Sequence, residues 1–213
     1  MILYLNIIFE LFCLCFAVFT LRSVKAPWTF FILYLLGVVS IETYGLYTAQ
    51  KHLSSNIIYN VYVFVNFFFV QMILYRIGNL NSTGKMPAWF FSVLFLLFYV
   101  GELLYNGFSE FTQTSIVLSN ILITIQSLYY FYSLMKQDHF VQLKTYAPFW
   151  LVAGLLIHAF GSTASFLFYG YLVAINKELN IPVRQIIFLF LNFILYSSWS
   201  YAFVCKYQQR ISS

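Results

Sequence analysis

Four ionisable side chains lie inside strongly apolar stretches of the sequence: Glu10, Glu42, Glu102 and His158. An ionised side chain at the centre of a lipid bilayer costs about 3 kcal/mol or more, so residues of this kind are candidates for a functional role. Carboxyl and imidazole groups can carry a proton, or they can hold the polar part of a small molecule. The chemistry to consider is therefore proton transfer or ligand binding within an apolar protein.

The composition indicates the surroundings of these residues. The chain has 213 residues, of which 62% are hydrophobic, 23% aromatic and 8% charged, whereas a soluble domain carries roughly 25% charged residues. Cys13, Cys15 and Cys205 all lie in apolar segments and form neither a disulfide framework nor a metal-binding pair. These features exclude a cytosolic enzyme, a nucleic-acid-binding module and a secreted disulfide scaffold. They indicate an integral membrane protein in contact with the lipid bilayer.

Seven stretches are long enough to cross a bilayer as helices, which takes about 20 apolar residues. They span residues 2–21, 27–48, 56–75, 87–107, 112–135, 148–175 and 182–205. The breaks between them are short, and irregular backbone cannot face lipid. We therefore expect an all-α polytopic protein in which residues 1–213 form a single seven-helix transmembrane domain. The first stretch is expected to be a retained helix, because Glu10 interrupts it and basic residues follow it, unlike in a cleavable signal.

Lys and Arg are distributed unequally between the two sets of breaks. Breaks one, three and five and the C-terminal tail hold eight: Arg22, Lys25, Arg76, Lys85, Lys136, Lys144, Lys206 and Arg210. The other side holds three: Lys51, Lys177 and Arg184. Because basic residues collect on the cytoplasmic side of membrane proteins, the N-terminus is expected outside and the C-terminus in the cytoplasm.

Polar side chains gather toward the outer side of this topology. Helical rise places Glu42, Glu102 and Thr163 ~22 Å from the cytoplasmic ends of their helices, in the outer third of a ~30 Å hydrocarbon core. The same side carries further amides: Asn60, Asn106, Asn120 and Gln185. Together these residues predict an outward-facing ligand-binding pocket with two carboxylates. The alternative is that Glu42 and Glu102 only reach up to the outer lipid headgroups.

A second polar layer lies near the middle of the bilayer. Glu10, His158 and Asn192 are each ~15 Å deep by helical rise, which predicts a proton relay. The alternative for Glu10 is a protonated carboxyl group that hydrogen-bonds a neighbouring helix. A Glu10–His158 pair is another way to meet the cost of burying the carboxylate. The helix of His158 also carries small residues at helical spacing: Gly154, Gly161, Ser162 and Ser165. Such a stripe either allows close helix packing or opens a cavity beside His158.

Several cofactor and catalytic classes are excluded by missing residues. A retinal pigment needs a lysine inside the last helix, which here has only Lys206 at its cytoplasmic end. One intramembrane histidine without an intramembrane aspartate does not make a zinc hydrolase site. The H-E-x-x-H, G-x-S-x-G and Walker sequences are absent. We expect no cofactor, no bound metal and no nucleic-acid partner.

Three parts of the chain carry a resemblance to other proteins. These parts are Ile57, Tyr59 and Asn60 in the third stretch, Leu128 through Tyr132 in the fifth, and Pro148, Phe149 and Trp150 followed by Gly154, His158, Gly161 and Ser162 in the sixth. They resemble a group of small seven-helix membrane proteins of Bacteroidota-type bacteria. The resemblance implies a multi-pass protein of a bacterial inner membrane, and it carries over no catalytic or ligand-binding residue.

The function expected from these patterns is the sensing or binding of a small molecule from outside by a non-enzymatic protein. Because the short loops leave no cytoplasmic domain, its output would need a partner such as a membrane kinase or another membrane subunit. Two alternatives remain. One is a small proton-coupled transporter that uses Glu10 and His158. The other is an intramembrane lipid-modifying enzyme with His158 as base beside Ser162.

Overall fold

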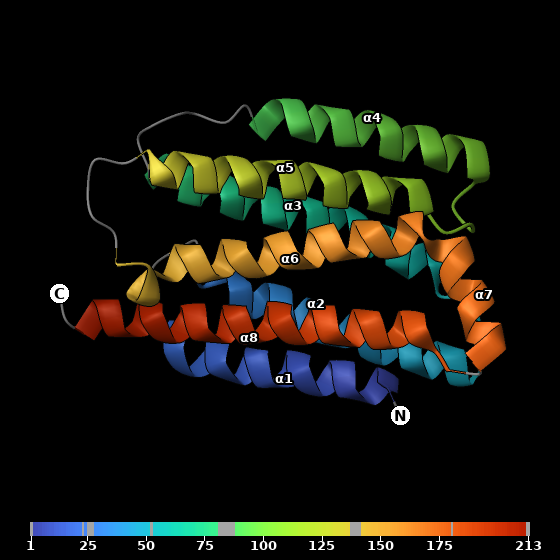
Figure 1. The fold of residues 1–213 in the computed structure, drawn as a ribbon, viewed down its shortest axis with the longest axis horizontal. Coiled ribbons are helices and arrows are strands. Elements are labelled where there is room, and N and C mark those ends of the chain that lie inside the picture. Colours follow the sequence, from blue (N-terminus) through green and yellow to red (C-terminus); the bar gives the residue numbers. More distant parts are fainter. Residues whose placement is uncertain are drawn as a thin grey trace. The chain divides into compact units, whose positions relative to one another are not determined.

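The computed structural model describes residues 2–22, 24, 28–51, 53–80, 88–136, 142–179 and 181–211, and these contain helices and turns but no strand. The elements are α1 (Ile2–Leu21), α2 (Phe30–Gln50), α3 (Asn56–Leu80), α4 (Ala88–Asn106), α5 (Gln113–Met135), the 3-10 turn η1 (Leu143–Thr145), α6 (Ala147–Leu167), α7 (Tyr169–Leu179) and α8 (Val183–Ile211) (Figure 1). All of these α-helices except α7 are long and apolar enough to cross a membrane. The expected all-α class and the expected number of membrane-length helices are confirmed. Two of the basic residues that set the predicted orientation, Lys25 and Lys85, lie outside the described residues.

The chain divides into two compact units, each of which is described by itself. Unit 1 comprises Met1–Val39 and Val141–Ser213, and unit 2 comprises Ser40–Phe140. Helix α2 therefore begins in unit 1 and ends in unit 2.

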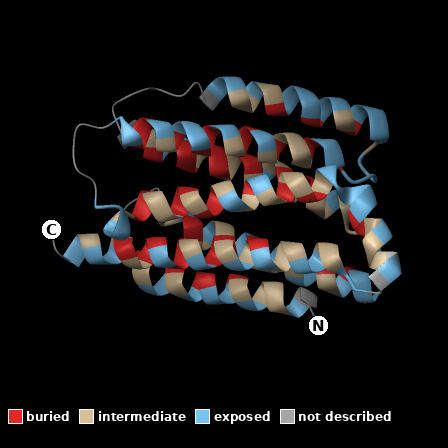
Figure 2. Ribbon diagram, viewed as in Figure 1, coloured by how far each residue is buried: buried red, intermediate tan, exposed pale blue. Residues whose placement is uncertain are grey.

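Unit 1 is organised around α8, which packs along both α6 and α1 (Figure 1). An aromatic cluster joins the start of α2 to the second half of α8. The ring of Phe31 lies 5.2 Å from the ring of Trp199 and 5.2 Å from that of Phe203, both edge to face. All three side chains are almost fully buried. Figure 2 shows the buried residues of α6 and α8 in red, while outer faces are pale blue.

In unit 2, α5 packs against α3 and α4. The α3–α4 contact is aromatic: Phe67 stacks on Phe95 at 3.9 Å between ring centroids, and Phe95 stacks on Tyr99 at 5.6 Å. Phe67 and Phe95 are fully buried. Stacked rings bury large apolar areas and also fix the rotation of both helices about their axes.

The structure corrects one predicted helix. Residues 148–175 were expected to form a single helix, but α6 ends at Leu167 and α7 begins at Tyr169. The 21 residues of α6 extend roughly 31 Å at helical rise, which already matches a ~30 Å hydrocarbon core. The hydroxyl of Ser165 donates to the carbonyl of Gly161 (2.9 Å) in the last turns of α6, and such bonds bend helices. Phe168 then leaves the helical conformation with φ −91° and ψ 18°.

The last helix is longer than expected at its C-terminal end. It was predicted to end at residue 205 and continues to Ile211. Its final turns are held to η1 by side chains. The hydroxyl of Tyr201 donates to the carbonyl of Lys144 (3.2 Å), and the amide of Gln209 donates to the carbonyl of Thr145 (2.8 Å). The polar side chains at the end of α8 therefore have hydrogen-bond partners in η1, which the sequence of α8 alone does not predict.

The small residues of α6 allow α6 and α8 to approach closely. A methyl group at Gly154 would lie 2.9 Å from Cβ of Ser198 and 3.4 Å from the carbonyl oxygen of Leu195. A methyl group at Gly161 would meet the side chain of Leu191. The contacts at both glycines are those expected of a helix-packing stripe.

Replacing Gly154 by Ala is expected to lower the free energy of unfolding by about 1–3 kcal/mol, because the added methyl group has no space against α8. Gly37→Ala in α2 is the matched control. A methyl group there meets nothing within 4 Å, so this variant should gain roughly 0.5–1 kcal/mol from helix propensity. Thermal unfolding of the two purified variants distinguishes these results, and equal stabilities would contradict the packing role of Gly154.

Candidate functional site

A cluster of hydrogen bonds holds the α4–α5 connection, on the predicted outer side of unit 2. Gly107 ends α4 with a positive φ of 81°, a conformation that glycine adopts without strain. Its N–H donates to the carbonyl of Leu103 (2.9 Å). The chain then crosses to α5, and side chains of α3 and α4 hold it, among them Asn60, Glu102 and Asn56, whose amide donates to the carbonyl of Ser109 (2.9 Å).

Asn60 on α3 is 2% exposed. Its amide nitrogen donates to the carbonyls of Phe108 (3.3 Å) and Glu110 (2.7 Å). Its amide oxygen accepts from the N–H and from the hydroxyl of Thr112, both at 3.0 Å. The hydroxyl of Tyr99 donates to the backbone carbonyl of Asn60 (3.0 Å). The whole amide is thus engaged in holding the connection to α3.

The carboxylate of Glu102 on α4 accepts hydrogen bonds from the first turn of α5. One oxygen accepts from the N–H of Thr114 (2.9 Å), and the other accepts from the N–H (2.7 Å) and the hydroxyl (2.5 Å) of Ser115. The first N–H groups of a helix lack partners within that helix, and a negative charge near them is favourable. Glu102 therefore caps α5 from a neighbouring helix.

Glu42 lies in the part of α2 that belongs to unit 2 and is half-buried. The side chain of Tyr59, from the start of α3, hydrogen-bonds with its carboxyl group. The hydroxyl of Tyr59 also lies directly against Gly45, where a Cβ atom would collide with it. The glycine makes room for the phenol one turn away from Glu42.

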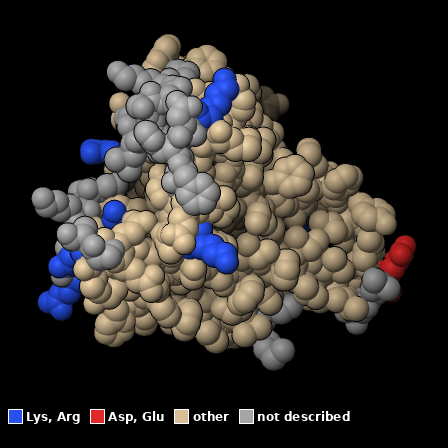
Figure 3. Space-filling view, turned by 60° about the vertical axis from the view of Figure 1, so that its left-hand side comes forward, with Lys and Arg blue, Asp and Glu red and all other residues tan. Residues whose placement is uncertain are grey.

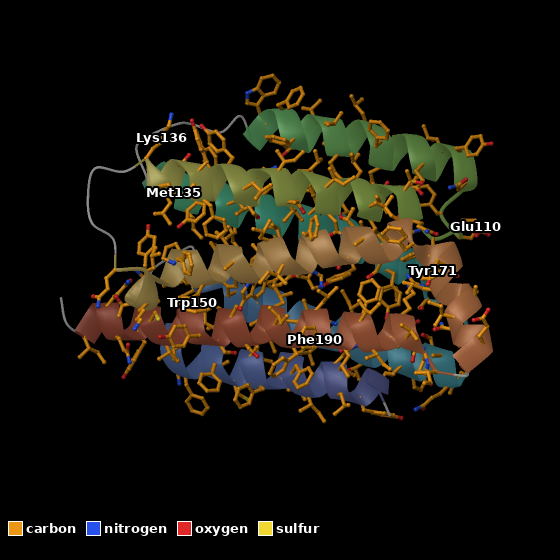
Figure 4. The ribbon with its side chains drawn as sticks, viewed as in Figure 1. Glu110, Met135, Lys136, Trp150, Tyr171 and Phe190 are labelled. Carbon is orange, nitrogen blue, oxygen red and sulfur yellow. The ribbon has the colours of Figure 1, made fainter. Side chains whose placement is uncertain are left out.

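A groove of ≈580 Å³ runs beside Glu102 on the outside of α4. Its lining residues are Leu97, Phe98, Gly101, Glu102, Tyr105, Asn106 and Thr114. Leu97, Phe98 and Tyr105 are 68%, 52% and 91% exposed, so the apolar wall is open to the surroundings. Glu110, on the connection at the end of this groove, is exposed (Figure 4). Two of the residues predicted to bind a ligand, Glu102 and Asn106, share this groove.

The other predicted ligand-binding residues do not line it. Glu42 and Asn60 have the partners given above, and Asn120 on α5 is half-buried. Thr163 and Gln185 belong to unit 1. The hydroxyl of Thr163 donates to the carbonyl of Ala159 (2.8 Å), and Gln185 is exposed. Their shared role in one pocket stays a prediction.

The predicted relay residues of unit 1 are organised by α8. Glu10 on α1 is 2% exposed, and the hydroxyl of Tyr196 donates to its carboxyl group (3.4 Å). Nε2 of His158 on α6 lies 3.0 Å from Oδ1 of Asn192. Asn192 and Tyr196 are four residues apart and share a face of α8. Within the described residues, His158 thus pairs with Asn192 and not with Glu10.

Asn192, the partner of His158, was predicted in the same layer, but the other partners of these polar residues were not predicted from the sequence. Tyr196 could have been predicted as a partner, because it lies one helical turn beyond Asn192 and therefore on the same face of its helix. Thr112 and Ser115 could also have been predicted to lie at a helix start, because hydroxyl residues before an apolar run are typical of such a position. No sequence pattern predicts the contact of Tyr59 with Glu42, since it depends on how α2 packs against α3.

Metal binding has no support in the part of the chain that the structure describes. No three His, Cys, Asp or Glu residues come together there in a way that could hold an ion. No family model, curated protein or solved structure matches the chain.

Glu102→Gln is expected to lower the free energy of unfolding by about 1–3 kcal/mol. The two N–H groups of α5 donate to different oxygens of Glu102; in glutamine one of these becomes an NH2 group, which cannot accept, and hydrogen bonds to a charged group are the stronger kind. Glu110→Gln is the control. It removes an exposed carboxylate of the same connection, and only the backbone carbonyl of Glu110 is hydrogen-bonded within the described residues. Thermal unfolding in detergent measures both variants. A Glu102→Gln variant as stable as Glu110→Gln would show that the cap contributes nothing.

Proposed function

We propose that this chain is a multi-pass protein of a bacterial inner membrane, with its N-terminus outside and its C-terminus in the cytoplasm. The seven membrane-length helices and the eight-to-three distribution of Lys and Arg support this placement. In Figure 3, most of the visible described surface is uncharged, a composition suited to contact with lipid. Within this setting, the proposed function is non-enzymatic binding of a small amphipathic molecule from the outer side.

The observation that carries this proposal is the groove along α4. Its wall consists of Leu97, Phe98 and Tyr105, whereas Glu102, Asn106 and Thr114 place polar groups at one end. An apolar trough with a few convergent polar groups is the usual form of a small-molecule site. The tail of the bound molecule would lie along the apolar wall, and its polar head would face Glu102 and Asn106.

The polar end of the groove selects the head group. A carboxylate offers about four lone-pair sites, and Glu102 uses three of them for α5. It retains capacity for one further donor, while the exposed amide of Asn106 can donate or accept. The groove is therefore suited to an amine or hydroxyl head group rather than to a carboxylate.

The same residues connect the groove to the rest of unit 2. Glu102 and Thr114 line the groove and also join α4 to the start of α5. A bound head group that contacts Glu102 competes with or strengthens these bonds, so binding changes the preferred position of α5. A ligand shifts a conformational equilibrium only through such a difference in contacts. The change would be passed to a partner, such as a membrane kinase or another membrane subunit.

The binding test uses dodecylamine as the probe and Gly101→Leu as the blocking variant. A methyl group at Gly101 meets nothing within 4 Å, so the leucine fills the groove without disturbing the fold. Dodecylamine is expected to raise the unfolding temperature of the wild-type protein, since a ligand at 100 times its Kd adds about 2.7 kcal/mol. Gly101→Leu should lose this increase.

Gly37→Leu is the control, because Gly37 is equally open but lies outside the groove. Dodecanoate, which has the same tail and an anionic head, should give no increase. A Gly101→Leu protein that is stabilised as strongly as the wild type would disprove binding in this groove.

A second candidate function is proton-coupled transport through unit 1. It is favoured by one specific observation: Glu10 and His158 lie on different helices, and each contacts α8 at positions one turn apart. The hydroxyl of Tyr196 and the amide of Asn192 are groups that can pass or orient a proton between the two. The proposed route runs from Glu10 along this face of α8 to His158.

The test of this route measures proton flux in proteoliposomes with an enclosed pH-sensitive dye and an imposed membrane potential. Glu10→Gln is expected to reduce the flux at least tenfold, because the amide cannot exchange a proton. Glu178→Gln, which removes an exposed carboxylate of α7, should leave it unchanged. Wild-type flux no greater than that of empty liposomes would eliminate the transport candidate and leave the groove untouched.

A further inference from the structure

Arg184, the second residue of α8, has its guanidinium group enclosed by aromatic rings. Its Cζ atom lies 4.9 Å from the ring centre of Tyr169, 5.2 Å from that of Phe166 and 5.5 Å from that of Phe188. The rings come from the end of α6, the start of α7 and α8 itself. Cation–π contacts are strongest where water is excluded. Three rings around one arginine therefore fix the position of the charge at the corner where these helices meet.

The rings cover the faces of the guanidinium group and leave its hydrogen-bond donors unused. Nε of Arg184 is buried without an acceptor among the described residues. Neither carboxylate of unit 1 that the structure describes forms an ion pair with Arg184: Glu10 accepts a hydrogen bond from Tyr196, and Glu178, six residues before Arg184, is exposed on α7. An arginine offers five N–H donors in a planar fork that matches carboxylate and phosphate groups. Its charge at this site has no counterion in the described part of unit 1.

The start of α8 adds to the positive potential at this corner. The first N–H groups of a helix have no intrahelical acceptor, and the helix dipole makes this end positive. The position of the helix start is itself fixed, because the side chain of Asn176 on α7 accepts a hydrogen bond from the N–H of Val183 (2.8 Å). The arginine and the helix start therefore both make the beginning of α8 favourable for an anion.

The surface next to Arg184 is apolar. Leu167, Phe168 and Tyr171 are 70%, 62% and 67% exposed. In Figure 1, α7 runs across the ends of α6 and α8 instead of along them, and Figure 4 labels Tyr171 on it. A short helix with exposed aromatic and aliphatic side chains at the end of membrane-length helices has the geometry of an interfacial helix. In a membrane, an anion bound at this corner would therefore lie next to the acyl chains of the lipids that contact these exposed side chains.

We propose that Arg184, its aromatic enclosure and the first turn of α8 form a binding site for the phosphate group of an anionic phospholipid in the outer leaflet. Because Nε is buried while the residue as a whole is partly exposed, the terminal N–H groups of the guanidinium bind the phosphate oxygens, and the exposed side chains of the α6–α7 turn contact the acyl chains. A zwitterionic lipid is a poorer ligand, because its own ammonium group would stand beside the arginine.

The test is native mass spectrometry of the full chain in detergent with an equimolar mixture of phosphatidylglycerol and phosphatidylcholine. The wild type is expected to retain phosphatidylglycerol in at least fivefold excess over phosphatidylcholine. Arg184→Gln should lose at least four-fifths of that excess. Lys51→Gln is the matched control, since Lys51 is an exposed cation of the same predicted side that lies over a single ring, that of Tyr47 at 4.6 Å, and its lipid binding should equal that of the wild type.

Two further arms keep the test decisive. Arg184→Lys retains the charge but loses the planar fork, and it should bind phosphatidylglycerol at an intermediate level even if Arg184→Gln does not fold. Inorganic phosphate should neither displace the lipid nor raise the unfolding temperature. The proposal is overturned if Arg184→Gln or Arg184→Lys binds as the wild type does, if Lys51→Gln loses as much as Arg184→Gln, or if phosphate alone gives the same stabilisation.

Discussion

One constraint shapes the structure: a polar group in apolar surroundings is costly unless the protein supplies a hydrogen-bond partner, because no water replaces a missing bond there. A few buried side-chain atoms, such as those of the Gln71 amide, remain without a partner among the described residues. The seven long helices satisfy their own backbone along most of their length. The exceptions are the helix ends and the few polar side chains. In unit 2, Asn60 and Glu102 supply the partners for the α4–α5 connection and for the first turn of α5. Asn60 and Glu102, which the sequence predicts to bind a small molecule, thus also hold this end of unit 2 together.

The same constraint explains where the helices of unit 1 stop. Helix α6 ends once it has covered about one bilayer thickness, and the chain continues as α7 in another direction. Helix α8 continues past the apolar stretch because η1 offers backbone carbonyls to Tyr201 and Gln209. The end of α6 thus follows from its apolar length, whereas the end of α8 follows from the polar partners that η1 supplies.

Buried ionisable groups are accommodated in three different ways. Glu102 accepts hydrogen bonds from a helix start, and Glu10 and His158 each pair with a polar side chain of α8. Arg184 is surrounded by aromatic rings, which stabilise its charge, and its Nε finds no acceptor among the described residues. The first two arrangements pair each group with a polar partner of the protein. The third gives the charge no such partner, which is why it points most directly to an external ligand.

The sequence by itself determined the all-α class, the number of membrane-length helices and the positions of most helix ends, because apolar runs of sufficient length allow no other regular structure. It also identified Glu10, His158 and Asn192 as one polar layer, since depth along a helix follows from counting residues. Only the tertiary structure decided that His158 pairs with Asn192, that Tyr196 reaches Glu10 and that Glu102 caps α5. These contacts depend on the rotation of each helix about its axis, and that rotation is set by close packing at positions such as Gly154 and Phe67, which no single helix encodes.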